Sequence, residues 1–190
     1  GQRGGVEIGP RAAHSGRVAI WITDHQLYQA TADLFCTTRP TTPIVYSPHI
    51  TEGNALQIDW ESVLAANECD FVMGNPPFIG YTYQSKEQKA DMAHVAGDIK
   101  KSKTLDYVAG WYIKAMHYMQ LVTKQRHHVE TAFVSTNSIV QGEHVAVLWQ
   151  YLLENCGGYI NFAHHTFRWT NEGKGVAAVH CVIVGYSTHE

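Results

Sequence analysis

The sequence lacks the features that mark exported, membrane-spanning and metal-scaffolded proteins. It has no run of about 18 consecutive apolar residues, the length that a transmembrane helix needs, and its first ten residues contain no apolar signal core. Its four cysteines form no Cys-x-x-Cys pair, so neither a disulfide framework nor a zinc site is expected. These absences favour a cytoplasmic protein with reduced thiols and no bound metal.

Basic clusters are also scarce, although histidine is not. The 190 residues include 12 histidines, but His127-His128 and His164-His165 are adjacent pairs that would point to opposite faces of a strand. The net charge is −3, and the only basic cluster is Lys100-Lys101-Ser102-Lys103. Because proteins that neutralise many phosphates usually carry a basic face, we expect any binding to nucleic acid to depend largely on regions outside this sequence.

Short apolar runs alternate with helical patterns, which is typical of an α/β architecture, here in one domain over residues 1–190. Pro10 begins the first expected helix, and Gly157-Gly158 ends the last. The expected strands are 5–8, 51–56, 70–73, 131–136, 159–165 and 176–186, the last two pairing antiparallel around a polar loop, and the expected helices are 11–29, 59–67, 84–94, 105–123 and 143–155.

The strongest chemical signal is Asn75-Pro76-Pro77-Phe78, directly after an apolar strand. The Asn75 side-chain oxygen and the Pro76 carbonyl can accept hydrogen bonds from an exocyclic amine and favour its pyramidal, nucleophilic form. Consecutive prolines fix φ and remove N–H donors, and Phe78 offers a flat face for an extruded base. Methyl transfer from a sulfonium cofactor then needs mainly alignment. The alternative is a plain turn, because all of these loop residues favour turns.

The Asn75–Phe78 segment resembles motif IV of amino-methyltransferases, in the form typical of adenine-specific DNA enzymes. Over nearly the whole chain the sequence is similar to the MmeI-like class, in which nuclease, methylase and target-recognition regions share one polypeptide. The segments that carry this resemblance are 88–92, 105–108, 133–138, 141–143 and 162–164. It implies S-adenosylmethionine as cofactor, double-stranded DNA as partner, and a Rossmann-like, mainly parallel sheet with a final antiparallel hairpin.

The same resemblance assigns cofactor contacts to Glu7, Asn54 and Asp106. Glu7, at a strand end, stands where an acidic residue binds the cofactor ribose; the alternative is a solvated carboxylate. Asn54 stands where a polar residue faces the adenine of the cofactor, although Gly53-Asn54 equally indicates a turn. Asp106, in the segment Leu105-Asp106-Tyr107 that opens the expected long helix, stands near the methionine end; the alternative is a first-turn helix charge.

A second aromatic is expected to stack on the target base, opposite Phe78. Phe167 and Trp169 both lie in the polar loop expected between the last two strands, and the sequence does not decide between them. Either ring is equally able simply to pack on the hairpin. His165 stands where the resemblance leads us to expect arginine, and histidine in place of arginine weakens a phosphate contact.

The glycine-rich turn of the family's cofactor site has no counterpart in this sequence, since Gly4-Gly5 lies too close to Glu7. We therefore expect a partial sheet without its first, central strand, open edges that favour self-association, and weak cofactor binding by the 190-residue chain alone. Three hypotheses follow: adenine methylation within a restriction–modification polypeptide, methylation of a protein glutamine, or a non-catalytic remnant or partner subunit. The segments 133–138, 141–143 and 162–167 favour the first.

Overall fold

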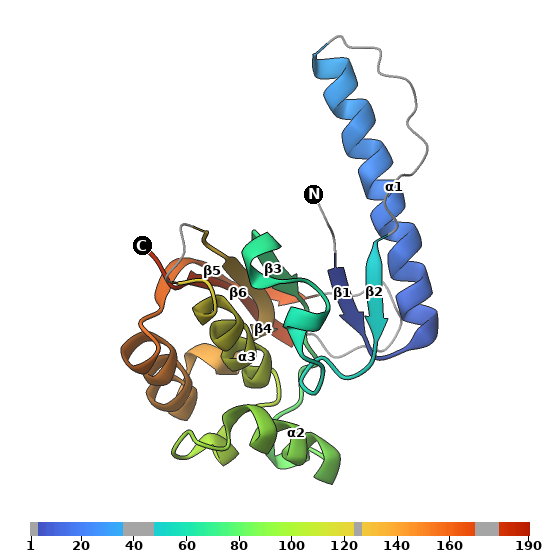
Figure 1. Cartoon of the computed structure of the whole chain (residues 1–190). Coiled ribbons are helices and arrows are strands. Elements are labelled where there is room, and N and C mark those ends of the chain that lie inside the picture. The colour runs from blue at the N-terminus through green and yellow to red at the C-terminus, as the bar shows by residue number, and fades with distance from the viewer. Residues whose placement is uncertain (1–3, 36–47, 124–126, 170–178) are drawn as a thin grey trace. The chain divides into compact units, whose positions relative to one another are not determined.

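The structure is a computed structural model that describes residues 4–35, 48–123, 127–169 and 179–190 (Figure 1). The chain divides into two compact units, Gly1–Ala65 and Ala66–Glu190. Each unit contains its own sheet and is described separately below. The expectation of a single domain over residues 1–190 stays a prediction.

The first unit is a parallel strand pair joined by a long helix. Strand β1 (Gly4–Glu7) pairs in parallel with β2 (His49–Glu52), with Glu7 opposite Glu52. Parallel strands need a crossover connection, and helix α1 (Pro10–Leu34) forms part of it. A hydrogen bond of 2.8 Å from the Arg17 guanidinium to the Ile50 carbonyl joins α1 to β2. Pro10 opens the helix as expected, but α1 extends beyond the expected end at residue 29.

The second unit contains a four-stranded sheet in the order β3-β4-β6-β5. Strand β3 (Phe71–Gly74) pairs in parallel with β4 (Glu130–Thr136), whereas β6 (Val179–Ser187) pairs antiparallel with both β4 and β5 (Tyr159–Trp169). The predicted antiparallel final pair is therefore confirmed. Strand β3 is an edge strand, and its Phe71 and Met73 side chains are 64% and 78% exposed.

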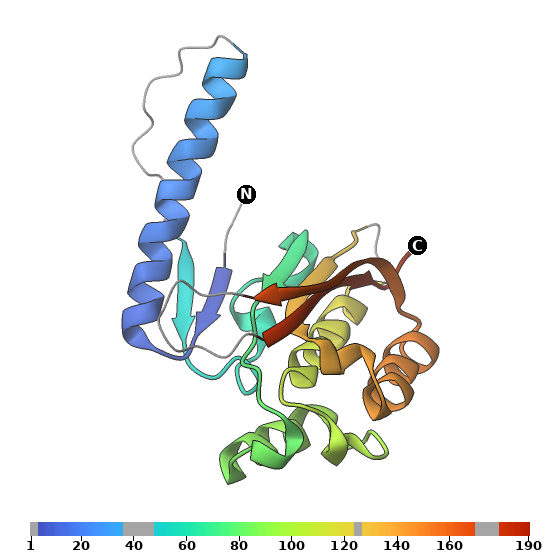
Figure 2. The ribbon, with the colours of Figure 1, turned by 180° about the vertical axis from the view of Figure 1, so that it is seen from behind.

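Helix α3 (Ala109–Gln120) lies at the centre of the core of the second unit, because eight of its twelve residues are buried. Tyr112 stacks on Tyr186 of β6 at 5.3 Å, and its hydroxyl lies 2.7 Å from the Ser135 hydroxyl of β4. Figures 1 and 2, seen from opposite sides, place α3 on one side of this sheet, with β5 and β6 in front of it in Figure 2. Burial raises the pKa of the Tyr112 hydroxyl well above its ordinary value.

The second unit contains two further helical segments, the first of which packs against α3. Helix α2 (Lys86–Ala96) begins with a capping box in which Ser85 and Gln88 exchange side-chain-to-backbone hydrogen bonds. The segment expected as a helix over 143–155 is helical but wound with π geometry over Val145–Trp149 and Tyr151–Asn155. It ends as predicted at Gly157, whose φ of +70° suits glycine, while the next amide donates to the Leu152 carbonyl at 2.9 Å.

Three expected boundaries were wrong for local reasons. Residues 59–67 are not one helix: Asp59 caps a single 3₁₀ turn at Trp60–Ser62, and a second such turn covers Ala66–Glu68. The helix expected from residue 105 begins only at Ala109. Strand β5 continues to Trp169, because two register shifts let its irregular segment keep pairing with β6.

Candidate active site

The Asn75–Phe78 segment follows β3 directly, as the sequence predicts. Gly74, the last residue of β3, pairs with Phe133 of β4, so the segment starts from the carboxyl end of a parallel strand. Asn75 is exposed, Pro76 is buried and Phe78 is partly buried. The Asn75 side chain has no hydrogen-bond partner among the described residues. Its amide oxygen is therefore available to a ligand.

Three hydrogen bonds fix the chain that follows Phe78. The Tyr107 amide donates to the Ile79 carbonyl at 2.8 Å, and the Tyr81 amide donates to Asp106 Oδ1 at 2.9 Å. A third bond of 2.9 Å runs from the Gln84 side-chain amide to the Leu105 carbonyl. The segment 79–84 is thus held along its length by the segment 105–107.

Asp106 lies at the centre of this arrangement and is 91% buried, with 9% of its surface exposed. Its Oδ1 accepts from Tyr81 N–H, and its Oδ2 accepts from the Ser138 hydroxyl at 2.7 Å. The backbone N–H of Asp106 donates to His144 Nε2 at 2.9 Å, which requires that nitrogen to be unprotonated. Asp106 precedes α3 by three residues, so the alternative interpretation as a first-turn helix charge is wrong.

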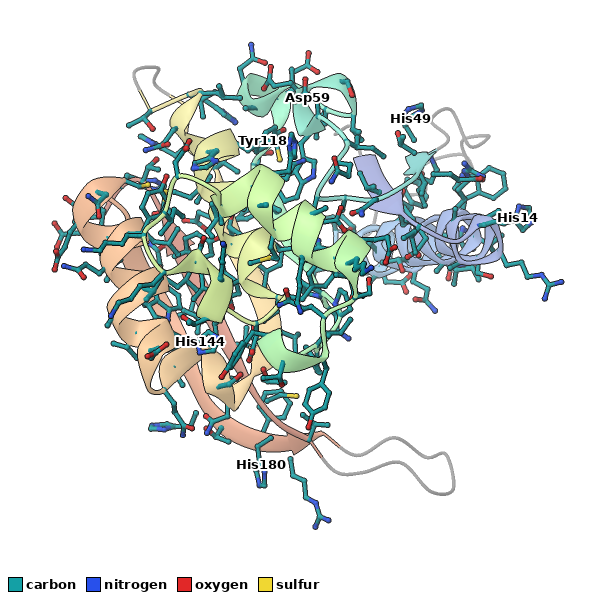
Figure 3. All side chains as sticks on the ribbon, turned by 90° about the horizontal axis from the view of Figure 1, so that it is seen from below. His14, His49, Asp59, Tyr118, His144 and His180 are labelled. Carbon is teal, nitrogen blue, oxygen red and sulfur yellow. The ribbon has the colours of Figure 1, made fainter. Side chains whose placement is uncertain are left out.

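His144, labelled in Figure 3, is buried at the start of the 143–155 helix. Burial lowers the pKa of His144, against a smaller opposing effect of the Asp106 and Glu143 carboxylates, and favours the neutral ring. The Asp106 Oδ2 to His144 Nε2 distance is 3.5 Å. A neutral ring fits the hydrogen bond that Nε2 accepts from the Asp106 backbone N–H, so the two residues are joined by that bond and not by an ion pair.

In the first unit, Glu7 and Asn54 come from the carboxyl ends of β1 and β2. The Gly53 amide donates to the Glu7 carbonyl at 2.9 Å, which places the Gly53-Asn54 turn beside the end of β1. Glu7 Oε1 accepts from the Gly9 amide at 3.3 Å, and Asn54 Oδ1 accepts from the Leu56 amide at 2.9 Å. The turn indicated by the sequence is therefore present. Ligands of α/β folds often bind at this edge, and the cofactor roles of Glu7 and Asn54 stay predictions.

Phe167 and Trp169 do not lie in a loop, which corrects the sequence-based expectation. Both belong to β5, where Phe167 pairs with Cys181 and Trp169 pairs with Val179 of β6. The Trp169 side chain lies outside the described part of the structure. Next to Phe167, the Thr166 hydroxyl donates to the Asn137 side-chain oxygen at 2.7 Å, so this part of β5 is tied to the turn that follows β4.

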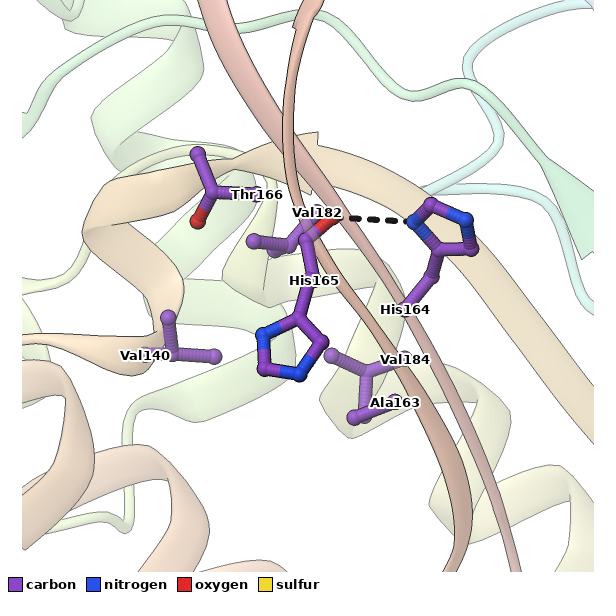
Figure 4. Close-up of a pocket in the computed structure, with 7 residues that line it drawn as sticks. All are labelled: Val140, Ala163, His164, His165, Thr166, Val182 and Val184. Atoms are coloured by element: carbon purple, nitrogen blue, oxygen red, sulfur yellow. Dashed lines mark hydrogen bonds between the residues drawn. The ribbon is translucent and has the colours of Figure 1, made fainter.

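A shallow, mainly apolar pocket of about 250 Å³ lies where β5 and β6 meet Val140 (Figure 4). His164 and His165 line it, and His164 Nδ1 donates to the His165 carbonyl at 2.9 Å. Among the described residues, no three His, Cys, Asp or Glu side chains gather as metal ligands would. The helices in the described ranges include none that is both long and apolar enough to cross a membrane.

Sequence reasoning missed Tyr81, Ser138 and His144 as parts of the site. Their partners lie 25, 32 and 38 residues away along the chain, so no local pattern signals these hydrogen bonds. One general signal was present for Ser138, because polar residues directly after a buried parallel strand often line sites at that edge of a sheet.

The chain belongs to the family of MmeI DNA-methyltransferase domains, whose model matches residues 1–190. It is 37% identical over 185 residues to DNA methyltransferase A of Bacillus subtilis (strain 168), covering 96% of this chain and 20% of that protein. It is also similar to the Type IIL restriction-modification enzyme MmeI solved in complex with DNA. That match has 49% identity and a TM-score of 0.85, and covers 98% of this chain and 24% of the other.

These matches confirm the resemblance inferred from the sequence. They also confirm a mixed α/β fold similar to that of the MmeI structure. The chain spans about a fifth to a quarter of the length of these two relatives.

Proposed function

We propose that this domain transfers a methyl group from S-adenosylmethionine to the exocyclic N6 amine of adenine in double-stranded DNA, within a restriction–modification polypeptide. The observation that carries the proposal is the position of Asn75-Pro76-Pro77-Phe78. It follows a parallel strand at its carboxyl end, with the Asn75 amide exposed and without a partner among the described residues.

The residues of this segment suit an amine acceptor. The Asn75 oxygen and the Pro76 carbonyl accept hydrogen bonds from the two N6–H groups, which localises the nitrogen lone pair, while Phe78 stacks on the extruded base. The cofactor supplies a methyl group on a positively charged sulfur. The new N–C bond forms as the C–S bond breaks with its electron pair going to sulfur, and the nitrogen releases a proton to water. No covalent intermediate with the protein is needed.

For the cofactor, we propose that Glu7 accepts hydrogen bonds from the ribose hydroxyls and that Asn54 contacts the adenine. Both residues come from the carboxyl ends of adjacent parallel strands, which is where nucleosides bind in α/β folds. We further propose that the glycine-rich turn completing this site, and a strand before it, come from sequence outside these 190 residues, in a Rossmann-like sheet.

The test is a methylation assay with the protein at its full natural length and DNA from a host without methylases. After incubation with labelled cofactor, the DNA is digested to nucleosides. These are identified by mass spectrometry, which distinguishes N6-methyladenine from N4-methylcytosine. We expect N6-methyladenine, and a loss of several orders of magnitude in Asn75→Ala. Asn67→Ala is the matched control, because Asn67 is also exposed but lies before β3.

Two outcomes would overturn this proposal. Full turnover by Asn75→Ala would show that Asn75 does not orient the amine. Absence of any methylated nucleoside, together with label on a protein glutamine, would favour glutamine methylation instead.

A further inference from the structure

The loop that carries Asn75 and Phe78 is held in place by residues distant in sequence. Its start is fixed because Gly74 pairs with Phe133. Its far side depends on the Tyr81 amide, which donates to Asp106 Oδ1 at 2.9 Å. Asp106 is 91% buried, so the accepting carboxylate is largely shielded from water, although Tyr81 itself is partly exposed.

The same carboxylate also fixes the turn that follows β4. Its second oxygen accepts from the Ser138 hydroxyl at 2.7 Å. In that turn, the neighbouring Asn137 accepts from Thr166 of β5 at 2.7 Å, one residue before Phe167. Three hydrogen bonds and the peptide link between Asn137 and Ser138 therefore join the segment after Phe78 to the strand that bears Phe167.

We propose that Asp106 is a positioning residue that sets the geometry of the Asn75–Phe78 loop relative to the turn after β4 and to β5. The inference rests on the proposed methyl transfer and assigns Asp106 a role distinct from direct cofactor contact. A carboxylate suits the role because it is acceptor-only, with one oxygen for each of its two donors. His144 supports it by accepting the Asp106 N–H at 2.9 Å, which fixes the backbone from which the carboxylate projects.

A positioning role and a cofactor-contact role predict different kinetics. A misplaced loop weakens alignment in the transition state, and small displacements are costly there. Asp106→Ala in the full-length protein should therefore lower kcat by at least tenfold. The dissociation constant for S-adenosylmethionine, measured by calorimetry, should change by less than about threefold, because a positioning role includes no contact with the cofactor. For comparison, a tenfold change corresponds to about 1.4 kcal/mol.

Graded variants separate positioning from simple destabilisation. Asp106→Asn keeps an oxygen for the Tyr81 amide and should restore most of kcat, while Ser138→Ala, which removes one donor, should fall between wild type and Asp106→Ala. Tyr112→Phe is the control: it loses a buried hydroxyl bonded to Ser135 and to the Phe133 carbonyl in the same unit, and it removes no hydrogen bond to the segment 79–84. It should lower thermal stability but leave kcat unchanged.

A second measurement serves if Asp106→Ala fails to fold. Hydrogen exchange of the segment 79–84 should be faster in Ser138→Ala and Asp106→Asn than in wild type, and unchanged in Tyr112→Phe. Unaltered kcat in Asp106→Ala, or a loss confined to cofactor affinity, would overturn the positioning role. Because wild type would still methylate DNA and Asn75→Ala would not, either result would leave the proposed function intact.

Discussion

Phe78 offers a direct measure of how much base stacking contributes to the reaction. Base–aromatic stacking is worth about 1–3 kcal/mol per base, and each 1.4 kcal/mol is a factor of ten. Phe78→Ala should therefore reduce the population of correctly placed base by about 5- to 150-fold, with a similar fall in single-turnover rate. Because Phe78 is only partly buried, its truncation should destabilise the fold less than the about 3–5 kcal/mol of a fully buried phenylalanine.

The assay distinguishes stacking from packing by two comparisons. Phe78→Leu keeps most of the apolar volume but loses the flat ring, so it should resemble wild type in thermal unfolding and Phe78→Ala in rate. Placing an abasic site opposite the target adenine lowers the cost of extrusion, so part of the lost rate should return on that duplex. Phe71→Ala is the matched control, since Phe71 lies on β3 with 64% of its surface exposed. Wild-type rates in both Phe78 variants would refute the stacking role.

Three further predictions concern other parts of the chain. Burial lowers the pKa of His144 below its ordinary value of 6.5, so His144 binds a proton more readily in the unfolded chain. The contribution of neutral His144 to the free energy of unfolding should be fully present above about pH 6.5 and should be lost as pH falls from there through the lower pKa of the folded state. His144→Gln should flatten the decline in thermal melts, and an equal slope would contradict it. Alanine at Phe167 or Trp169 should reproduce the Phe78→Ala defect at one position only; normal rates at both would remove the second stacking surface. The 190-residue chain alone should bind S-adenosylmethionine weakly and self-associate, whereas micromolar binding by a monomer in calorimetry and light scattering would show that it completes its own site.

The sequence was sufficient where local chemistry decides the structure. The apolar run before Asn75 predicts β3 and the edge from which the motif starts, and Gly157 predicts the end of the last helix. It failed at β5, because register shifts between His164 and Phe167 break the alternation by which a strand is recognised. It also failed for the partners of Asp106, since hydrogen bonds between distant segments depend on the completed packing.

The packing around Trp149 has a spectroscopic consequence. Its indole N–H donates to the Ile139 carbonyl at 2.8 Å, and its ring is 94% buried, with 6% exposed, edge-on to Tyr112. Ile139 sits beside Ser138 in the turn after β4, so the emission of this tryptophan reports on that turn. In a protein with Trp149 as its single tryptophan, opening of the turn would expose the indole to water and shift its fluorescence to longer wavelength. The chain thus contains an intrinsic optical probe next to the hydrogen bonds that hold Asp106.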